Sequence, residues 1–332
     1  MPEVVALGEA MLRLTPPNYR RLEQADCFEV EVGGAELNTA VGLVRLGRAV
    51  AWVSRLPDQP LGRLVLNRAR AAGVDVSAVQ LTPGGRVGLY FLEQGAAPRP
   101  GSIVYDRQDS AMARLRPGQF DWPSLFASAR WFHVTGITPA LSSSASEAVR
   151  EALHAARSAG LTVSMDVNYR AKLWSLEQAR RWLQEATHCV DVLITGEGGE
   201  QLLGVEPGPF EQTARQLCER FGLRAVAMTQ REAPLVWRNR LSALAYAADG
   251  DRVFTTASYE IEVVDRLGAG DAFAAGLIDG LLANDPQRGL DQATALAALK
   301  HTVPGDLPWL DRADLDAAMQ AAQAGGGLRL NR

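Results

Sequence analysis

Short apolar runs alternate with longer segments of helical period along most of the chain, and this alternation limits the possible folds more than any other feature. A parallel sheet covered on both faces needs strands of nearly continuous apolar sequence, and its crossover connections are usually helices. We therefore predict an α/β fold, with a central, mostly parallel sheet flanked by helices. The predicted strands are residues 4–7, 50–54, 131–135, 161–166, 190–195 and 225–229, and the predicted helices are residues 35–46, 142–159, 176–187 and 209–221.

Two segments interrupt the alternation, residues 12–32 and 86–107. In the second, residues 87–92 and 102–105 have the character of strands and are joined by a Gly/Pro-rich loop. We expect the two segments to form a small β-sheet lid on a single domain that comprises residues 1–332. Ligands of open α/β sheets bind at the carboxyl ends of the strands, so a lid there could close over a substrate and exclude water. The glycine triplet 325–327 is expected to be a flexible tail.

Composition argues against several classes of function. The formal net charge of -4 over 332 residues provides no basic surface for nucleic acid, so no nucleic-acid partner is expected. The three cysteines form no C-x-x-C pair, as is common for reduced thiols in the cytosol. Residues 1–8 lack a basic region followed by an apolar stretch, and no run approaches the roughly 20 apolar residues that span a bilayer. We expect a cytoplasmic protein with no membrane partner.

Residues 265–271, Asp-Arg-Leu-Gly-Ala-Gly-Asp, form the most informative motif. Residues 261–264 before it have the pattern of a strand, and residues 272–282 after it have the pattern of a helix buried on one side. Gly268 and Gly270 let backbone amides approach an anion closely, and a helix N-terminus favours phosphate. Asp271 has two interpretations at this point: it stabilises the helix N-terminus, or it accepts a proton from an attacking hydroxyl.

A family resemblance distinguishes between them. Residues 264–276, Val-Asp-Arg-Leu-Gly-Ala-Gly-Asp-Ala-Phe-Ala-Ala-Gly, resemble the C-terminal signature of the ribokinase-like (PfkB) carbohydrate kinases. Residues 33–40, Gly-Gly-Ala-Glu-Leu-Asn-Thr-Ala, resemble the family's N-terminal glycine pair, whose helix start faces the sugar. The resemblance implies a ribokinase-like fold with a β-lid, ATP and Mg²⁺ as cofactors, and Asp271 as the base. It also implies an anion hole at Gly268, Ala269 and Gly270, and a sugar site at Gly34 and Asn38.

A Rossmann dinucleotide site is a poorer interpretation of these glycines. No G-x-G-x-x-G follows the first predicted strand, where that fingerprint belongs.

Three further segments, residues 132–141, 166–170 and 298–306, resemble the 2-keto-3-deoxygluconate kinases within this family. The resemblance implies phosphorylation of the 6-hydroxyl of 2-keto-3-deoxygluconate, and it places Gly34, Tyr90, Tyr105, Arg107 and Arg170 around this acid sugar. Arginine suits the carboxylate because its planar fork binds both oxygens.

Structural interpretations of these residues stay open. Arg107 could instead pair with Asp106 or Asp109 on the surface, and Arg170 with Asp166. His133 and His301 are interpreted as structural residues, because phosphoryl transfer already has its base.

The nucleotide and metal sites match the family less well. The family's Asn-x-x-Glu motif, which organises Mg²⁺ and phosphate, is expected near residues 196–204, where this chain has no asparagine. Glu197 or Glu200 could take that role. The resemblance places the nucleotide near Asn168, Thr229 and Lys300, beside Gly268 and Gly270.

Two alternative functions stay open: a kinase of the same fold that acts on a neutral sugar or a nucleoside, such as a fructokinase or ribokinase, and a non-catalytic sugar-binding regulator. The missing asparagine keeps the second alternative open. The resemblance also implies at least a dimer, formed through the lid sheets, with Leu89 and Phe91 as candidate apolar contacts.

Overall fold

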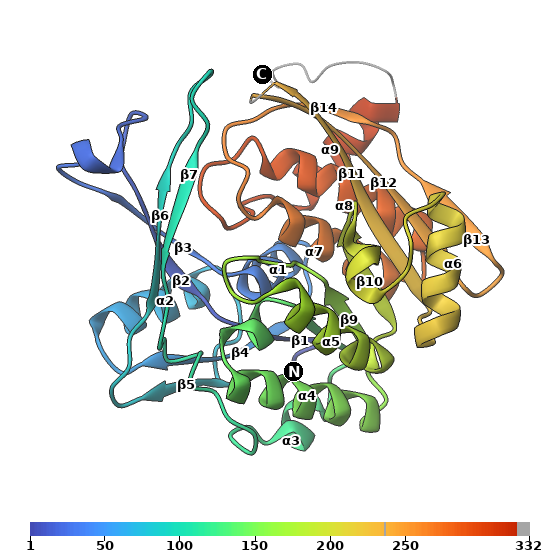
Figure 1. Ribbon diagram of the computed structural model, residues 1–332, viewed down its shortest axis with the longest axis horizontal. Coiled ribbons are helices and arrows are strands. Elements are labelled where there is room, and N and C mark those ends of the chain that lie inside the picture. Colours follow the sequence, from blue (N-terminus) through green and yellow to red (C-terminus); the bar gives the residue numbers. More distant parts are fainter. Residues whose placement is uncertain (236, 324–332) are drawn as a thin grey trace.

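The computed structural model describes residues 1–235 and 237–323, and in it helices cover both faces of a large central sheet (Figure 1). The glycine triplet 325–327 lies outside the described residues. Within them the central sheet has ten strands in the order β13-β12-β11-β10-β9-β8-β1-β4-β5, with β14 paired to β12. The strands are β1 (Val4–Leu7), β4 (Val50–Pro57), β5 (Val79–Thr82), β8 (Trp131–Thr135), β9 (Thr162–Asp166), β10 (Val192–Gly196), β11 (Ala225–Leu235), β12 (Arg238–Ala247), β13 (Arg252–Thr255) and β14 (Tyr259–Glu262).

The parallel part of the sheet confirms the predicted fold class. From β11 to β5 every neighbouring pair of strands is parallel, and all six strands predicted in this region are present. β12, β13 and β14 pair antiparallel at one edge. Because the parallel strands share one direction, the residues that follow β1, β8, β9 and β10 meet at a single edge of the sheet, where ligands of such folds bind.

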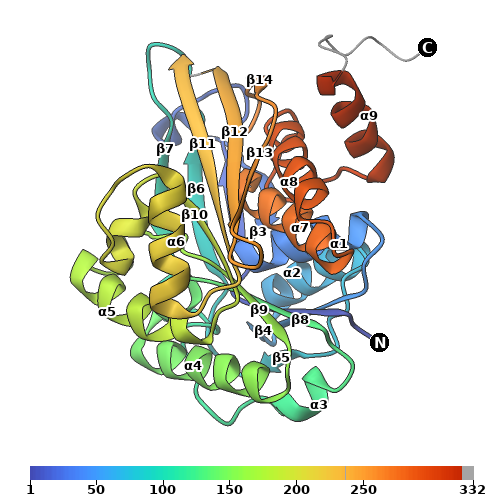
Figure 2. The same ribbon diagram turned by 90° about the vertical axis from the view of Figure 1, so that its right-hand side faces the viewer.

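Helices form a layer on each face, which Figure 2 shows edge-on. A separate apolar cluster fills the space under each layer, with Trp52 and Phe273 in one and Phe132 and Leu153 in the other. One layer contains α1 (Ala35–Arg45), α2 (Pro60–Ala71), α7 (Ala269–Leu282) and α8 (Pro286–Lys300), with α9 (Arg312–Gln323) against α8, and the other contains α3 (Trp122–Phe126), α4 (Ser143–Ser158), α5 (Leu176–Ala186) and α6 (Phe210–Phe221).

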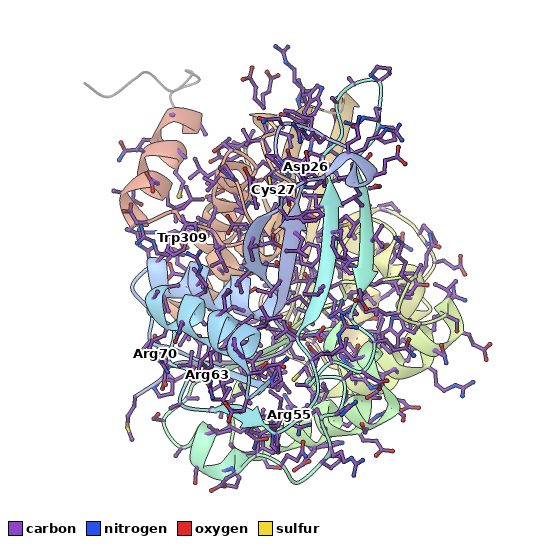
Figure 3. All side chains as sticks on the ribbon, turned by 90° about the vertical axis from the view of Figure 1, so that its left-hand side faces the viewer. Asp26, Cys27, Arg55, Arg63, Arg70 and Trp309 are labelled. Atoms are coloured by element: carbon purple, nitrogen blue, oxygen red, sulfur yellow. The ribbon has the colours of Figure 1, made fainter. Side chains whose placement is uncertain are left out.

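The two segments predicted to form a lid build a second sheet of four strands, in the order β3-β2-β6-β7. It rises beside the central sheet in Figure 1, and Figure 3 looks onto its outer side, with Asp26 and Cys27 at its upper edge. β2 pairs antiparallel with β3 and parallel with β6, and β6 pairs antiparallel with β7. The strands are β2 (Met11–Thr15), β3 (Glu29–Gly33), β6 (Gly88–Glu93) and β7 (Ser102–Asp106).

The phosphate-turn prediction needs one correction. The strand predicted at residues 261–264 ends two residues earlier, as β14, and the helix predicted to begin at residue 272 begins at Ala269. Asp271 and Gly270 therefore lie inside the first turn of α7.

Among the described residues, no helix is both long enough and apolar enough to cross a bilayer.

Candidate active site

The start of α7 is a turn that only glycine fits well. Gly268 is the N-cap of this helix and has φ of +81°, in the left-handed region that favours glycine. A Cβ at this position would also overlap the backbone carbonyl oxygen of Asp306. The turn therefore presents the amides of Gly268, Ala269 and Gly270 at a helix N-terminus, where unpaired N–H groups and the helix dipole favour an anion.

Asp271 lies in this first turn, and α1 holds its carboxylate. Asn38 Nδ2 donates a hydrogen bond to Asp271 Oδ2 at 2.7 Å, and Gly34 N–H donates to Asn38 Oδ1 at 3.3 Å. Gly34 has no room for a side chain, because a Cβ there would overlap the carbonyl oxygen of Glu9. The starts of α1 and α7 thus form one hydrogen-bonded unit, although they are more than 230 residues apart in the chain.

Burial sets the charge state of the carboxyl groups in this region. It raises the pKa of Asp271 to about 6, against the lowering effects of the Asn38 hydrogen bond and the Arg170 charge. At the carboxyl end of β9, burial and then the nearby Asp271 charge raise the pKa of Asp166 to about 7. Asn168 N–H donates to Asp166 Oδ1 at 3.0 Å. A carboxyl group with a pKa near neutrality is well matched to accepting a proton from a hydroxyl.

The second sheet turns one polar face toward this region. Arg13, Glu31, Tyr90 and Tyr105 are cross-strand neighbours on β2, β3, β6 and β7, so the alternation of side chains puts all four on the same face. The ring centroids of Tyr90 and Tyr105 are 5.8 Å apart.

A buried ion cluster joins this face to the turn. Arg13 Nη1 lies 2.7 Å from Asp265 Oδ2 and 3.0 Å from Asp306 Oδ1, and the Tyr90 hydroxyl donates to the other oxygen of Asp306. Asp265 also accepts the amides of Leu267 at 3.1 Å and Gly305 at 3.0 Å. Because Asp265 begins the 265–271 motif, Arg13 connects the second sheet directly to the anion-binding turn.

Arg107 has a different partner from those considered for it. Its Nε donates to Glu9 Oε2 at 2.9 Å and its Nη2 pairs with the same oxygen, whereas Asp106 pairs with Arg86. Ser110 donates to the other oxygen of Glu9. The Arg107 guanidinium carbon is 5.8 Å from the Tyr105 ring centroid, so the arginine also borders the tyrosine wall.

Arg170 reaches the same region from the loop after β9. It is exposed, and its charge acts on both Asp166 and Asp271. Lys172, two residues further on, lies 5.7 Å from the Tyr105 ring centroid and donates to the Ile103 carbonyl at 2.8 Å. This loop therefore contacts the second sheet.

A cavity of about 410 Å³ opens beside the turn. Its walls come from the carboxyl end of β10, the adjacent middle part of β11, β12, the start of α7 and the end of α8. The carboxyl end of β10 is at the edge of the sheet where ligands are expected. It is lined by Gly196, Glu197, Thr229, Arg231, Leu241, Arg266, Ala269, Gly270, Phe273, Ala297 and His301.

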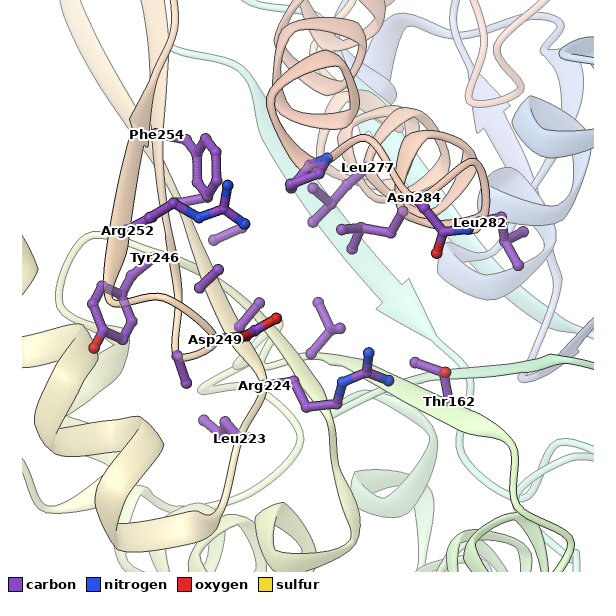
Figure 4. A pocket seen from close by; sticks show the side chains of 18 of the residues that line it. Thr162, Leu223, Arg224, Tyr246, Asp249, Arg252, Phe254, Leu277, Leu282 and Asn284 are labelled. Atoms are coloured by element: carbon purple, nitrogen blue, oxygen red, sulfur yellow. The ribbon is translucent and has the colours of Figure 1, made fainter.

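A larger hollow of about 480 Å³ lies at the other edge of the sheet (Figure 4). Arg224, Tyr246, Asp249 and Arg252 are among its lining residues, with Leu277 from α7 opposite them. It includes none of the predicted site residues, and it faces the amino ends of β9, β10 and β11. The cavity beside Gly270 is therefore the better candidate for chemistry.

Comparison with known proteins identifies the family. The model of the family described as "pfkB family carbohydrate kinase" matches residues 1–311. The chain belongs to this family. A relative from Haloferax volcanii, named 2-dehydro-3-deoxygalactonokinase, is 37% identical over 97% of this chain and 98% of its own. A Thermoproteus tenax relative, named 2-dehydro-3-deoxygluconokinase, is 35% identical over 92% of this chain and 90% of its own.

A solved structure supports the same grouping and confirms the ribokinase-like fold. The crystal structure of 2-dehydro-3-deoxygluconokinase from Thermotoga maritima is 37% identical to this pfkB chain. It superimposes with a TM-score of 0.92 and covers 96% of this chain and 98% of that one.

Most of the predicted site residues come together in this pfkB kinase. Gly34, Asn38 and the turn from Gly268 to Asp271 form one unit, and the Arg170 charge acts on Asp271 from the loop after β9. In the same loop, Asn168 N–H is bonded to Asp166. Tyr90, Tyr105 and Arg107 border it from the second sheet. Thr229 and Glu197 line the cavity, but Glu200 is buried outside its lining and Lys300 is wholly buried behind the turn.

The two histidines have bonds that fit structural roles. His133 is buried, with Nδ1 2.8 Å from the Ser164 hydroxyl, and burial lowers its pKa to about 4. His301 Nδ1 lies 2.7 Å from the Ala297 carbonyl, although its ring also lines the cavity.

Four residues of the region were not predicted: Glu9, Arg13, Asp166 and Asp306. Arg13 alone left a signal in the pattern, because an arginine between Leu12 and Leu14 on a strand must occupy the face opposite to theirs. Asp166 and Asp306 lie in the family-like segments 166–170 and 298–306, but the resemblance of these segments did not assign a chemical role to either aspartate. Nothing in the local sequence links Glu9 to Arg107, which lies 98 positions away.

Proposed function

We propose that this carbohydrate kinase transfers the γ-phosphoryl group of ATP to the 6-hydroxyl of 2-keto-3-deoxygluconate, which gives 2-keto-3-deoxy-6-phosphogluconate. The observation that carries the proposal is the buried Asp271 carboxylate, fixed by Asn38 at the amide-rich start of α7. The names of the Thermoproteus tenax and Thermotoga maritima proteins support the choice of sugar.

Asp271 is the base of the proposed reaction. Its carboxylate accepts the proton of the sugar hydroxyl as that oxygen attacks phosphorus, and Asn38 keeps the carboxylate oriented. The amides at Gly268, Ala269 and Gly270 donate to the phosphoryl oxygens, where negative charge develops in the transition state. They are held in place before the reaction and need little reorganisation during it.

The cavity beside Gly270 is the proposed nucleotide site. Thr229 and Ala297 line it, and its inner end is the α7 turn, so a nucleotide bound there would direct its phosphates at the amides. Asn168 N–H is bonded to Asp166, a carboxyl group that interacts with Asp271. Lys300, which the family resemblance placed near the nucleotide, is wholly buried and has no surface with which to touch it.

Mg²⁺ fits a site of this kind with few protein ligands. Within the part of the chain that the structure describes, no group of three or more His, Cys, Asp or Glu side chains could hold a metal ion. Mg²⁺ usually keeps several waters and uses one or two carboxylates together with substrate phosphates, whose charge it neutralises. Glu197 is exposed at the cavity and could supply such a carboxylate, whereas Glu200 Oε2 is buried and without a hydrogen-bond partner among the described residues.

The acid end of the sugar is assigned to the two arginines. Arg170 is exposed and acts electrostatically on Asp271, so its guanidinium is available to a carboxylate next to the base. Arg107 is paired with Glu9 through two of its guanidinium nitrogens. It therefore contributes positive charge beside Tyr105, and not a free guanidinium that could bind both oxygens of the sugar carboxylate. Tyr90 and Tyr105 form the wall above the sugar, with the Tyr90 hydroxyl committed to Asp306.

Replacing Arg170 with alanine should raise KM for the acid sugar by at least about tenfold and leave KM for a neutral sugar nearly unchanged, because a hydrogen bond to a charged group is lost. Steady-state kinetics on both sugars measure the difference. Arg86→Ala is a matched control, since Arg86 pairs with the exposed Asp106. Equal losses on both sugars in Arg170→Ala would contradict the carboxylate assignment.

The acid side of the pH profile should report the base. Because the deprotonated form of Asp271 is the active one and burial raises its pKa to about 6, kcat/KM should be level above this pH and fall about tenfold per unit below it. The Asp271 charge raises the pKa of Asp166, so the two groups interact and the measured value belongs to the pair. A profile that stays flat down to pH 4.5 would exclude Asp271 as the base.

Direct identification of the product tests the proposed function. Purified enzyme, MgATP and 2-keto-3-deoxygluconate should give one ADP per sugar phosphate, and phosphorus–proton correlation in NMR should place the phosphate on C6. The C4 epimer, 2-keto-3-deoxygalactonate, belongs in the same experiment, because the Haloferax volcanii relative is named for it. Turnover of fructose, ribose or a nucleoside in place of both acids would favour a neutral-sugar kinase. Binding of acid sugar and ATP without ADP would favour a non-catalytic regulator.

The outer face of the second sheet supports the proposed dimer. Leu14, Val30, Phe91 and Val104 are cross-strand neighbours on the face opposite to Arg13 and Tyr90, and Val30 and Val104 are exposed. Leu89 and Phe91, the predicted contacts, are half-buried on this face. Apolar sheet surface of this kind is usually covered by a partner. Light scattering should give twice the mass of the chain, and Phe91→Lys should reduce it to that of one chain.

A further inference from the structure

Lys300 is a lysine with no exposed surface, at the last position of α8. Lysine is almost never fully buried unless its charge is compensated. The chain uses arginine nearly everywhere else: of its 34 Lys and Arg residues only Lys172 and Lys300 are lysines. One of these two lysines, with its compact ammonium, thus occupies a fully buried position.

The Lys300 side chain lies directly behind the anion-binding turn. A Cβ added to Gly268 would be 3.3 Å from Lys300 Cε. The loop after Lys300 is hydrogen-bonded to the segment that leads into the same turn. The His301 carbonyl accepts hydrogen bonds from the amides of Val264 at 2.8 Å and Asp265 at 3.0 Å. Lys300 Nζ donates to the Val303 carbonyl at 3.0 Å within this loop.

A cap for the end of α8 would explain only part of this arrangement. A basic side chain near a helix C-terminus is stabilising, but it can do so while its ammonium stays in water. Lys300 instead gives up all of its exposure, and burial lowers its pKa while the charges of Asp265, Asp306 and Asp271 raise it. The desolvation cost of a buried ammonium is large, so a charged Lys300 needs opposite charges close to it.

The charges around the turn give that compensation. Asp265, Asp306 and Asp271 are three buried carboxyl groups. Buried Arg13 interacts with Asp265 and Asp306, buried Lys300 interacts with all three, and the exposed Arg170 acts on Asp271. The site must also accept the negative charge of a phosphoryl group. Without Lys300, only Arg13 and the exposed Arg170 of these three cations would face the carboxylates, and the potential at the turn would be less favourable to an incoming anion.

We propose that the Lys300 ammonium is the fixed internal countercharge of the phosphoryl-transfer turn. It offsets Asp265 and Asp306 from behind, keeps the loop 301–306 in place through Val303, and so positions the amides of residues 268–271 for the transferred group. Lys300 is a positioning residue, since it touches neither sugar nor nucleotide. The assignment rests on the proposed function of the turn, and it deepens it by naming the source of its positive potential.

Two substitutions separate charge from packing. Lys300→Met keeps the approximate volume of the side chain without the charge, and Lys300→Ala leaves a space that a small cation can enter. Both should lower kcat by about tenfold or more with a smaller effect on KM for the sugar, because preorganised charge acts on the transition state. Ammonium chloride should restore a large part of kcat in Lys300→Ala, relative to sodium chloride at equal ionic strength. Ammonium chloride should not restore kcat in Lys300→Met, because the methionine side chain fills the space. It should not change kcat in Lys172→Ala either, because the Lys172 ammonium of the unmodified chain lies over the Tyr105 ring and not behind the turn.

A measurement without turnover keeps the test decisive if the variants are unstable. The thermal unfolding temperature of Lys300→Ala should rise in ammonium chloride over sodium chloride, with no such rise for Lys300→Met. Tetramethylammonium, which is too large and cannot donate, should have no effect on either. Normal kcat in Lys300→Met, or a Lys300→Ala variant that responds equally to ammonium and sodium, would overturn the proposal.

The acceptor for these assays is whichever sugar the unmodified enzyme phosphorylates. Failure on 2-keto-3-deoxygluconate with turnover of another sugar would overturn the substrate assignment alone. Ammonium rescue could then still be measured with that other sugar, so the two proposals fail separately.

Discussion

Replacing Asp271 with asparagine is expected to lower kcat by at least about two decades while KM for the sugar changes little. Asparagine keeps the shape of the side chain and an oxygen that can still accept the 2.7 Å hydrogen bond from Asn38. It cannot take a proton from the sugar hydroxyl. The loss should therefore fall on the chemical step and not on binding, which steady-state kinetics and calorimetric titration of the sugar measure together.

Asp279→Asn is the matched control. Asp279 is also buried on α7, eight residues further along, but its oxygens bind Arg48 at 2.7 Å and Arg312 at 2.8 Å, far from the turn. Its replacement should reduce stability and leave kcat close to normal. Near-normal turnover in Asp271→Asn would exclude Asp271 as the base, and an equal loss of kcat in Asp279→Asn would show that α7 responds to any lost carboxylate.

Replacing Arg13 with methionine is expected to lower the free energy of unfolding by about 3–5 kcal/mol. The Arg13 side chain is 3% exposed and compensates Asp265 and Asp306, which are almost as buried. Removing Arg13 takes its ion pairs from two buried carboxylates, which then repel each other and keep only the more distant Lys300 charge as compensation among the cations described here. The second sheet also loses its link to the turn, so KM for the sugar should rise as well.

Arg20→Met is the control for this effect. Arg20 forms an ion pair with Asp26 at 2.9 Å between β2 and β3, but the two side chains are 47% and 88% exposed. Its loss should cost at most about 1 kcal/mol, because water screens the pair. Guanidinium denaturation of both variants gives the comparison. If Arg13→Met were no less stable than Arg20→Met, the buried cluster would not hold the second sheet to the turn.

The elements that were predicted correctly are those with a strong local pattern. β1 and β8 have the predicted bounds because each is a short, wholly buried and mainly apolar run in the middle of a parallel sheet. The start of α7 was placed too late, because glycine, alanine and aspartate in its first turn carry no apolar period, and the turn is fixed instead by contacts from the loop 301–306.

α2 and α8 were not predicted. The apolar positions of α8 are mostly alanines, so its periodicity is weak although the helix is deeply buried.

In the candidate site, too, residues that are neighbours in the sequence could be predicted, whereas partners that are distant in the sequence could not. The glycines and Asp271 could be found because they are neighbours in sequence and their chemistry follows from the backbone. The partners that complete the site are distant: Arg13 and Asp306 are 293 residues apart, and Arg107 and Glu9 are 98 apart. No periodicity specifies which arginine meets which carboxylate, since that depends on how the second sheet is placed over the first.

The preference of the unmodified enzyme for an acid sugar over a neutral one tests the central claim most directly. In one ADP-release assay, kcat/KM is measured for 2-keto-3-deoxygluconate, 2-keto-3-deoxygalactonate and fructose at saturating MgATP. We predict that kcat/KM for at least one of the two acids exceeds that for fructose by at least about a hundredfold. Fructose has no carboxylate, so it leaves the arginine of the site without its charged hydrogen-bond partner, and a loss of this kind costs about that factor. A value for fructose equal to or above those of both acids would contradict the account.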